Sequence, residues 1–289
     1  MHHLMKISDR FWYYTPVGET DRPILGMVVG TERTLMIDAG NSPAHAREFL
    51  KALAGQNVAE PDMVVLTHAH WDHIFGLSAL EGVLSVSSAH TREKIAGQIG
   101  LSWSDEALEE RARSWTVTQH SIDAIRKEFG QEREIALVET RMTFTDRLEV
   151  DLGGVTCVLQ HVGGDHAADS SVVYIPEEKL LFLADCLCPD IHAPQRNYTP
   201  RGTVELLDRL DAFDAEVYIW SHGGLTSKEE YRQEAALLRA IAGCTEQFGG
   251  DRSRIAAAYA QELSRELNEY EQETIDYFVS GYGLGNKPI

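Results

Sequence analysis

The sequence has few cysteines, no long apolar run and no secretory leader pattern. Its four cysteines are irregularly spaced: Cys157, Cys186, Cys188 and Cys244. They do not predict a disulfide framework, so a reduced, cytoplasmic location is the simpler expectation. No apolar run approaches the ~20 residues that span a bilayer, and residues 1–6 lack the charged-then-apolar layout of a signal peptide. We therefore expect a cytoplasmic protein with no membrane partner.

Basic residues are also scarce. The 289 residues include 26 Lys and Arg against 45 Asp and Glu, which gives a formal net charge of −19. A field of this sign repels phosphate backbones, and no run of lysine or arginine offsets it. We therefore expect a small-molecule substrate and no nucleic-acid partner. With 43% hydrophobic residues, the chain is long enough to bury a full core.

The densest group of chemistry-bearing side chains lies at residues 67–73. His68, His70, Asp72 and His73 directly follow the apolar run 63–66. A buried strand that ends in such a group delivers imidazoles and a carboxylate to one edge of a sheet. A single extended segment cannot aim all four at one ion, so two neighbouring metal ions would use them better. The alternative interpretation is a histidine-rich surface loop without a metal.

This pattern resembles the metallo-β-lactamase superfamily, in which the first two histidines bind one metal and the Asp-His pair binds the other. The resemblance implies further ligands, and candidates follow in the right order. His166 precedes an apolar strand, Asp185 ends the apolar run 180–184, and His222 ends another run. The resemblance covers roughly residues 20 to 225, and the four motifs together are more specific than any one of them.

Two departures from the family pattern lie beside these ligands. The family often has Pro-Gly-His where this chain has Gly164-Asp165-His166, and Gly-Asp where it has Ala184-Asp185. Neither departure removes a ligand, although both alter the backbone near the site.

The resemblance also implies how the metals are held. One metal would be bound by His68, His70 and His166, the other by Asp72, His73 and His222, with Asp185 bridging both. Histidine and carboxylate donors suit two divalent ions, with Zn²⁺ favoured and Fe or Mn left open. Asp72 and Asp185 therefore count as catalytic candidates as well as ligands.

Four further side chains near these motifs have two interpretations each. Asp38 is either a turn carboxylate or an acceptor that orients a ligating histidine. Cys186 is either a zinc thiolate or, as we favour, a small apolar residue beside the site. Tyr198 either donates to a substrate carbonyl, as in some thioesterase and lactonase relatives, or is an ordinary loop residue, and His192 stays equally open.

The order of expected elements fits an α/β (α+β) protein. Two series of strands flanked by helices match the four-layer αββα sandwich that the resemblance implies. We expect this core over residues 1–225, with further helices at 226–289 packed on it. Residues 98–134 carry two amphipathic stretches and are predicted to form a helical insertion, either a lid or a subunit contact of a homo-oligomer, or two packed helices without a role.

The expected activity follows from the resemblance. It implies a dinuclear metal-dependent hydrolase that uses a metal-bound hydroxide on a thioester, lactone or β-lactam. The alternatives are a mononuclear iron persulfide dioxygenase-like oxidoreductase and a phosphodiesterase or nuclease of the same superfamily. A redox flavo-diiron relative would ordinarily carry Glu where His70 stands, and a non-catalytic binding module would tend to have lost ligands.

Overall fold

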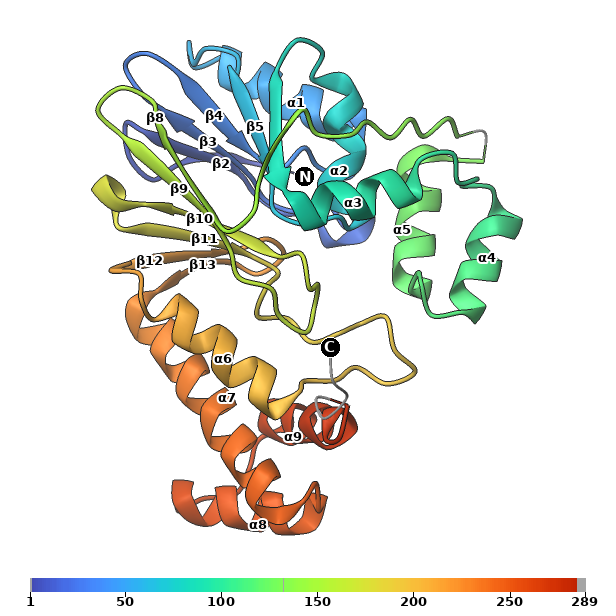
Figure 1. The fold of residues 1–289 in the computed structure, drawn as a ribbon, viewed down its shortest axis with the longest axis vertical. Coiled ribbons are helices and arrows are strands. Elements are labelled where there is room, and N and C mark those ends of the chain that lie inside the picture. The colour runs from blue at the N-terminus through green and yellow to red at the C-terminus, as the bar shows by residue number, and fades with distance from the viewer. Residues whose placement is uncertain (1, 132, 285–289) are drawn as a thin grey trace.

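Residues 2–131 and 133–284 are described by a computed structural model, in which two β-sheets pack face to face between layers of helices (Figure 1). The first sheet contains β1 (Leu4–Lys6), β2 (Phe11–Tyr14), β3 (Leu25–Val29), β4 (Thr34–Ile37), β5 (Met63–Leu66), β6 (Leu84–Ser88) and β7 (Met142–Phe144), in that order. The second has the order β13 (Gly224–Ser227), β12 (Val217–Trp220), β11 (Leu180–Ala184), β10 (Ser171–Ile175), β9 (Thr156–His161) and β8 (Arg147–Asp151). The predicted αββα sandwich is confirmed.

Helices cover the outer face of each sheet. The first sheet carries α1 (Pro43–Ala54), α2 (Trp71–Ile74), α3 (Ala89–Gln98), α4 (Asp105–Arg113) and α5 (Gln119–Phe129) on its side of the molecule. The second is covered by α6 (Pro200–Leu210), α7 (Lys228–Phe248), α8 (Arg252–Leu263) and α9 (Glu269–Gly281). Three short 3-10 helices, η1 (Gly18–Thr20), η2 (Phe75–Ala79) and η3 (Pro176–Glu178), lie in connections. Among the described residues, no helix is both long and apolar enough to cross a membrane.

Continuous apolar strands arise because both faces of each sheet are covered. In β5, Met63 and Val65 belong to the cluster between the sheets, whereas Val64 and Leu66 belong to the cluster under the helices. Successive side chains of a strand point to opposite faces, so a strand buried on both sides must be apolar throughout. The same rule explains the apolar run of β11.

One edge of the sandwich gathers the ends of strands from both sheets. β11 and β12 are parallel, and β10 is antiparallel to β11, so the loop before β10 lies at the edge where β11 and β12 end. The sheets are joined there by two backbone hydrogen bonds of 2.8 Å each: Ser171 donates to Thr67 and Ile24 donates to Ser221. Loops following β5, β11 and β12 therefore meet at one place.

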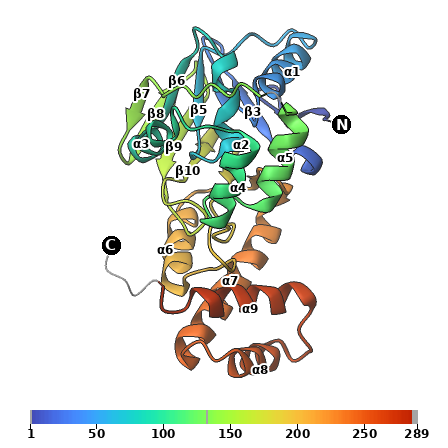
Figure 2. The ribbon, with the colours of Figure 1, turned by 90° about the vertical axis from the view of Figure 1, so that its right-hand side faces the viewer.

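Two helical additions flank this edge. Helices α4 and α5 form the predicted insertion and bury Leu108, Ile122 and Ile125 in the cluster under the first sheet. Helix α7 begins with a capping box of Ser227 and Glu230, and α8 and α9 lie at the end of the molecule far from α1 (Figure 2). The short strand β13 ahead of α7 has no counterpart in the sequence prediction.

Candidate metal centre

The seven predicted ligands come together in two groups at the shared edge. Ligand atoms of His68, His70 and His166 lie within 4.8 Å of one another, and so do those of Asp72, His73, Asp185 and His222. Each group combines side chains from both sheets. The assignment of these residues as ligands stays a prediction, but their convergence is a feature of the structure.

Asp185 lies between the two groups. Its Oδ2 atom is 2.9 Å from Nε2 of His73, 3.6 Å from that of His222, 3.8 Å from that of His68 and 3.9 Å from that of His166. Two of these histidines belong to each group. One carboxylate oxygen therefore has the placement that a bridging ligand requires.

The motif divides between the groups because its backbone changes conformation at His70. His70 is extended, with φ −72° and ψ 148°, and precedes the single turn of α2. In the extended part, His68 and His70 lie two residues apart and share a side. In the helical turn, Asp72 and His73 rotate away toward the other group. This accounts for the way one short segment contributes to both groups.

Asp38 orients two histidines. Nδ1 of His73 donates to its Oδ2 over 2.8 Å. Thr67 donates its hydroxyl to the same oxygen over 2.9 Å, and that hydroxyl lies 3.1 Å from Nδ1 of His68. A proton held on each Nδ1 leaves the Nε2 lone pair facing the site. The contact favours the histidine-orienting interpretation of Asp38 over that of a turn carboxylate.

The nitrogens that face the site fit a metal. Nδ1 of His166 donates to the carbonyl of Pro189 over 3.2 Å. Nε2 of His68 and Nε2 of His166 are buried, and neither has a hydrogen-bond partner among the described residues. Unpaired buried polar atoms are costly, and two of them aimed at one carboxylate require an explanation. A divalent cation that accepts both lone pairs would supply one, so the donor set fits the metals that the family implies.

Electrostatics differ between the groups. Burial lowers the pKa of His68 to about 3 and also lowers the pKa values of His70 and His166. These three rings are neutral at pH 7 and offer free lone pairs.

The second group consists of charges that stabilise one another. Burial opposes the charge of His73 and His222, but the neighbouring carboxylates of Asp72 and Asp185 raise the pKa of both rings well above the usual value. Burial likewise opposes ionisation of the two aspartates, and the histidines hold their pKa values well below the usual range. A divalent cation entering this group would displace protons from the rings.

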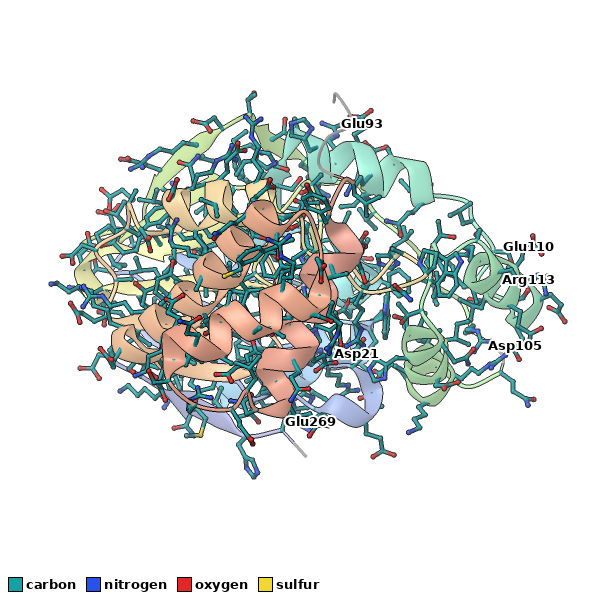
Figure 3. All side chains as sticks on the ribbon, turned by 90° about the horizontal axis from the view of Figure 1, so that it is seen from below. Asp21, Glu93, Asp105, Glu110, Arg113 and Glu269 are labelled. Carbon is teal, nitrogen blue, oxygen red and sulfur yellow. The ribbon has the colours of Figure 1, made fainter. Side chains whose placement is uncertain are left out.

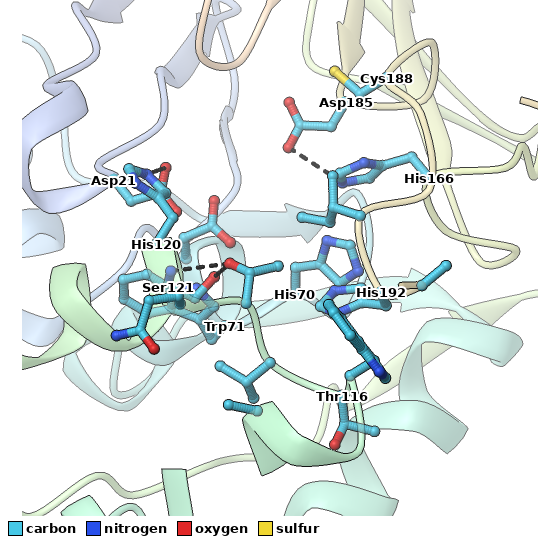
Figure 4. Close-up of a pocket in the computed structure, with 18 of the residues that line it drawn as sticks. Asp21, His70, Trp71, Thr116, His120, Ser121, His166, Asp185, Cys188 and His192 are labelled. Atoms are coloured by element: carbon cyan, nitrogen blue, oxygen red, sulfur yellow. Dashed lines mark hydrogen bonds and ion pairs between the residues drawn. The ribbon is translucent and has the colours of Figure 1, made fainter. Parts of the chain in front are cut away.

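A cavity of about 770 Å³ opens onto both groups. The insertion contributes Trp103, Trp115 and Val117 to its wall, and the loop after β11 contributes Ile191 and His192. Figure 4 shows Asp185, His166 and His192 on one side of the cavity and Asp21 and His120 on the other. The insertion's part of the wall combines aromatic and apolar side chains with polar ones such as Thr116, Gln119 and Ser121, whereas the floor is formed by the proposed ligands.

Tyr198 is not among the residues that line this cavity, which favours its interpretation as a loop residue over that of a donor to substrate. Its hydroxyl donates to the carbonyl of Leu187 over 2.8 Å, and its ring packs against Tyr277 and Phe278 of α9. The side chain is 7% exposed. These contacts connect the loop after β11 to α9 and stabilise it.

The structure also shows where Cys186 and His192 lie, two residues for which the sequence left two interpretations. Cys186 is buried in the cluster under the second sheet, and burial raises the pKa of its thiol, so apolar packing fits it better than ligation. His192 lines the cavity with its ring 4.8 Å from that of His70. Sequence reasoning missed Asp21 and Cys188 in the wall. No local pattern marks either one, because each reaches the cavity through the fold.

The comparisons with known proteins agree with this arrangement. A family model described as the metallo-beta-lactamase superfamily matches residues 22–222. A linear primary-alkylsulfatase of Pseudomonas sp. (strain ATCC 19151) is 25% identical over 243 residues, which cover 72% of this chain and 43% of that protein. The acyl-coenzyme A thioesterase MBLAC2 of Gallus gallus is 28% identical over 189 residues, 62% of this chain and 62% of that protein. The chain thus matches less than two thirds of either relative's length.

A solved structure shares the fold over nearly the whole chain. The inverting sec-alkylsulfatase Pisa1 from Pseudomonas sp. superposes with a TM-score of 0.65 at 16% identity, covering 99% of this chain and 51% of that one. At this identity the likeness concerns the fold alone. It extends beyond the region of the family model to the helices that follow.

Proposed function

The chain belongs to the metallo-beta-lactamase superfamily of hydrolases, and on that premise we propose that it is a dinuclear metal-dependent hydrolase of a small, ester-like substrate. The substrate classes proposed are thioesters, lactones and β-lactams. One observation carries the proposal: two donor groups flank a single carboxylate oxygen of Asp185. Divalent ions held there would polarise the substrate and lower the pKa of water toward neutrality.

The protein's own part is binding and orientation. His68, His70 and His166 would hold one ion with neutral nitrogens. Asp38, acting through Thr67, fixes the tautomer of His68, and the Pro189 carbonyl fixes that of His166. Asp72, His73 and His222 would hold the other with a carboxylate and two rings that give up protons. Asp185 would set the spacing of the pair. We propose Zn²⁺ as the ion, because imidazole nitrogens with carboxylate oxygens suit it; with no thiolate in the set, Fe and Mn stay open.

The cavity supports a substrate with an apolar group. Arg196 is the one Lys or Arg among the described lining residues, while Asp21, Asp72 and Asp185 all face the cavity. The aromatic wall of the insertion can cover an apolar acyl group and keep water from that side of the ester. We therefore propose that the insertion serves as a cavity wall.

The sequence similarity to an alkylsulfatase supports a second candidate, a hydrolase of alkyl sulfate esters. Such a substrate also places an apolar chain beside the metals. Its anionic head would be bound by the two divalent ions and by Arg196. A panel of thioesters, lactones, β-lactams and alkyl sulfates of equal chain length separates the two.

His68→Ala tests the proposal. Loss of this imidazole should deplete bound metal and lower kcat/KM more than about 100-fold, since even partners that only orient ligands contribute 10- to 100-fold. Metal analysis of the purified variant, together with turnover of the best substrate, measures both effects. Full activity in this variant would contradict the hydrolytic assignment.

A further inference from the structure

Asp21 lies against the last of the proposed ligands. One carboxylate oxygen, Oδ1, is 3.5 Å from Nδ1 of His222 and 3.4 Å from Nε2 of His120 on α5. The side chain is 18% exposed and forms part of the cavity wall. In Figure 3, Asp21 lies where the insertion meets the rest of the molecule, whereas Asp105, Glu110 and Arg113 lie farther out on the insertion.

His222 needs an acceptor on the side that Asp21 occupies. Its Nε2 atom faces the metal position, 3.1 Å from Oδ2 of Asp72. A proton kept on Nδ1 leaves the Nε2 lone pair free for a cation. His73 receives this help from Asp38 over 2.8 Å. His222, 35% exposed at its side chain and followed by two glycines, has more freedom to rotate than the buried His73.

The turn that carries Asp21 is closed and strained. Val17 and Arg22 exchange backbone hydrogen bonds of 2.9 and 3.1 Å across it. Asp21 itself has φ 53° and ψ 37°, a left-handed conformation that is uncommon for a residue other than glycine. Such strain persists only where the surroundings impose the conformation.

Helix α5 supplies that constraint. Arg22, next to Asp21, forms two hydrogen bonds with Glu128 of α5, from Nε to Oε2 over 3.0 Å and from Nη2 to Oε1 over 2.7 Å. The two side chains are only 14% and 4% exposed. A forked pair of this kind fixes direction as well as distance. The insertion therefore contacts the turn at two places: His120 lies against Asp21, and Glu128 accepts hydrogen bonds from Arg22.

We propose that Asp21 is a positioning residue for His222, and that His120 ties it to the insertion. Through this chain of contacts the insertion, besides forming the cavity wall, orders the metal position formed by Asp72, His73 and His222. The inference rests on the proposed ligand role of His222. It goes beyond the proposed hydrolase by making one of two metal positions depend on the helical insertion.

The test measures metal binding rather than turnover. The full chain, depleted of metal, is titrated with Co²⁺ in the presence of a competing chelator, and the visible absorption of each equivalent is followed. Asp21→Ala should lower the affinity for one equivalent of Co²⁺ by about 10- to 100-fold and leave the affinity for the other within about 3-fold of the wild type. Asp21→Asn keeps an acceptor oxygen and should lie between the wild type and Asp21→Ala. His120→Ala should weaken the same equivalent by a smaller factor.

The matched control is Asp123→Ala on the same helix. Asp123 is 57% exposed and contacts Gln119 and Arg126 rather than the cavity. The Asp123→Ala substitution removes the same charge from the chain and should leave the affinity for both equivalents of Co²⁺ unchanged. If Asp21→Ala fails to fold, Asp21→Asn and His120→Ala carry the test.

The outcomes separate the inference from the proposed function. Two equivalents bound by the wild type, with one selectively weakened in the variants, support the inference. Variants that bind both equivalents as the wild type does, or lose both equally, overturn it while the dinuclear hydrolase stands. A wild-type chain that binds one equivalent or none overturns the dinuclear function itself and the inference with it.

Discussion

Asp38 supports metal binding because its Oδ2 atom orients two proposed ligands, His73 directly and His68 through the Thr67 hydroxyl. Its own backbone is left-handed, with φ 59°, and the side chain is fully buried. Asp38→Ala should lower zinc affinity by about 10- to 100-fold, since both His73 and Thr67 lose their acceptor. Competition with a chelator measures the affinity. Unchanged affinity would mean that the rings are held by packing alone.

Substitution of Tyr198, in contrast to that of Asp38, should have little effect on activity. Because its hydroxyl donates to Leu187 and does not reach the cavity, Tyr198→Phe should leave kcat/KM within about 3-fold and cost about 1 kcal/mol of unfolding free energy. Steady-state kinetics and urea denaturation measure the two effects. A loss of 100-fold or more at full metal content would restore the substrate-contacting role.

At this scale the sequence predicts which side chains converge at the site better than it predicts the residues that support them. His68, His70, Asp72 and His73 are adjacent in the chain, and the later ligands follow strands in a recognisable order. Asp21 and the true contacts of Tyr198 depend on segments that meet only after folding. A turn aspartate and a loop tyrosine have no sequence spacing that reveals such partners.

The insertion is the element that shapes the cavity. Trp115 is 48% exposed and lines the cavity, so it can be truncated with little loss of core packing. Trp115→Ala should lower kcat/KM for substrates with a bulky apolar group by about 5-fold, the equivalent of about 1 kcal/mol of lost apolar burial. Substrates with a small acyl group should be unaffected. A uniform loss across a chain-length series would contradict this role.

Elements were predicted well where periodicity is strong. The helices of the insertion follow amphipathic spacing, which acts locally and can be recognised in the sequence. The strand β13 was missed because its stability comes from pairing with β12 rather than from its own residues. The use of the insertion as a cavity wall also depends on tertiary packing, so its sequence left a lid and a subunit contact equally open.

For the whole molecule, the two donor groups set opposite pH limits on the metal-free fold. His68, His70 and His166 have lowered pKa values, so their stability contribution is lost as pH falls below the unfolded value of about 6.5. His73 and His222 have raised pKa values. Their contribution to stability is therefore present below about pH 6.5 and is lost as the pH rises toward the pKa values of the folded state. The metal-free chain should therefore be most stable near pH 6.5.

Thermal unfolding of chelator-treated protein from pH 5 to pH 9 measures this optimum. Zinc should raise Tm most on the alkaline side, where it replaces the protons that the second group has lost. A metal-free Tm that rises steadily from pH 6.5 to pH 9 would contradict the charge arrangement of Asp72, His73, Asp185 and His222.

The account depends on two cations on either side of Asp185. The most direct measurement is anomalous diffraction at the zinc absorption edge from crystals grown with zinc. We expect two peaks that share the Asp185 carboxylate, one among His68, His70 and His166 and the other among Asp72, His73 and His222. A single peak, or peaks away from these side chains, would contradict the dinuclear centre.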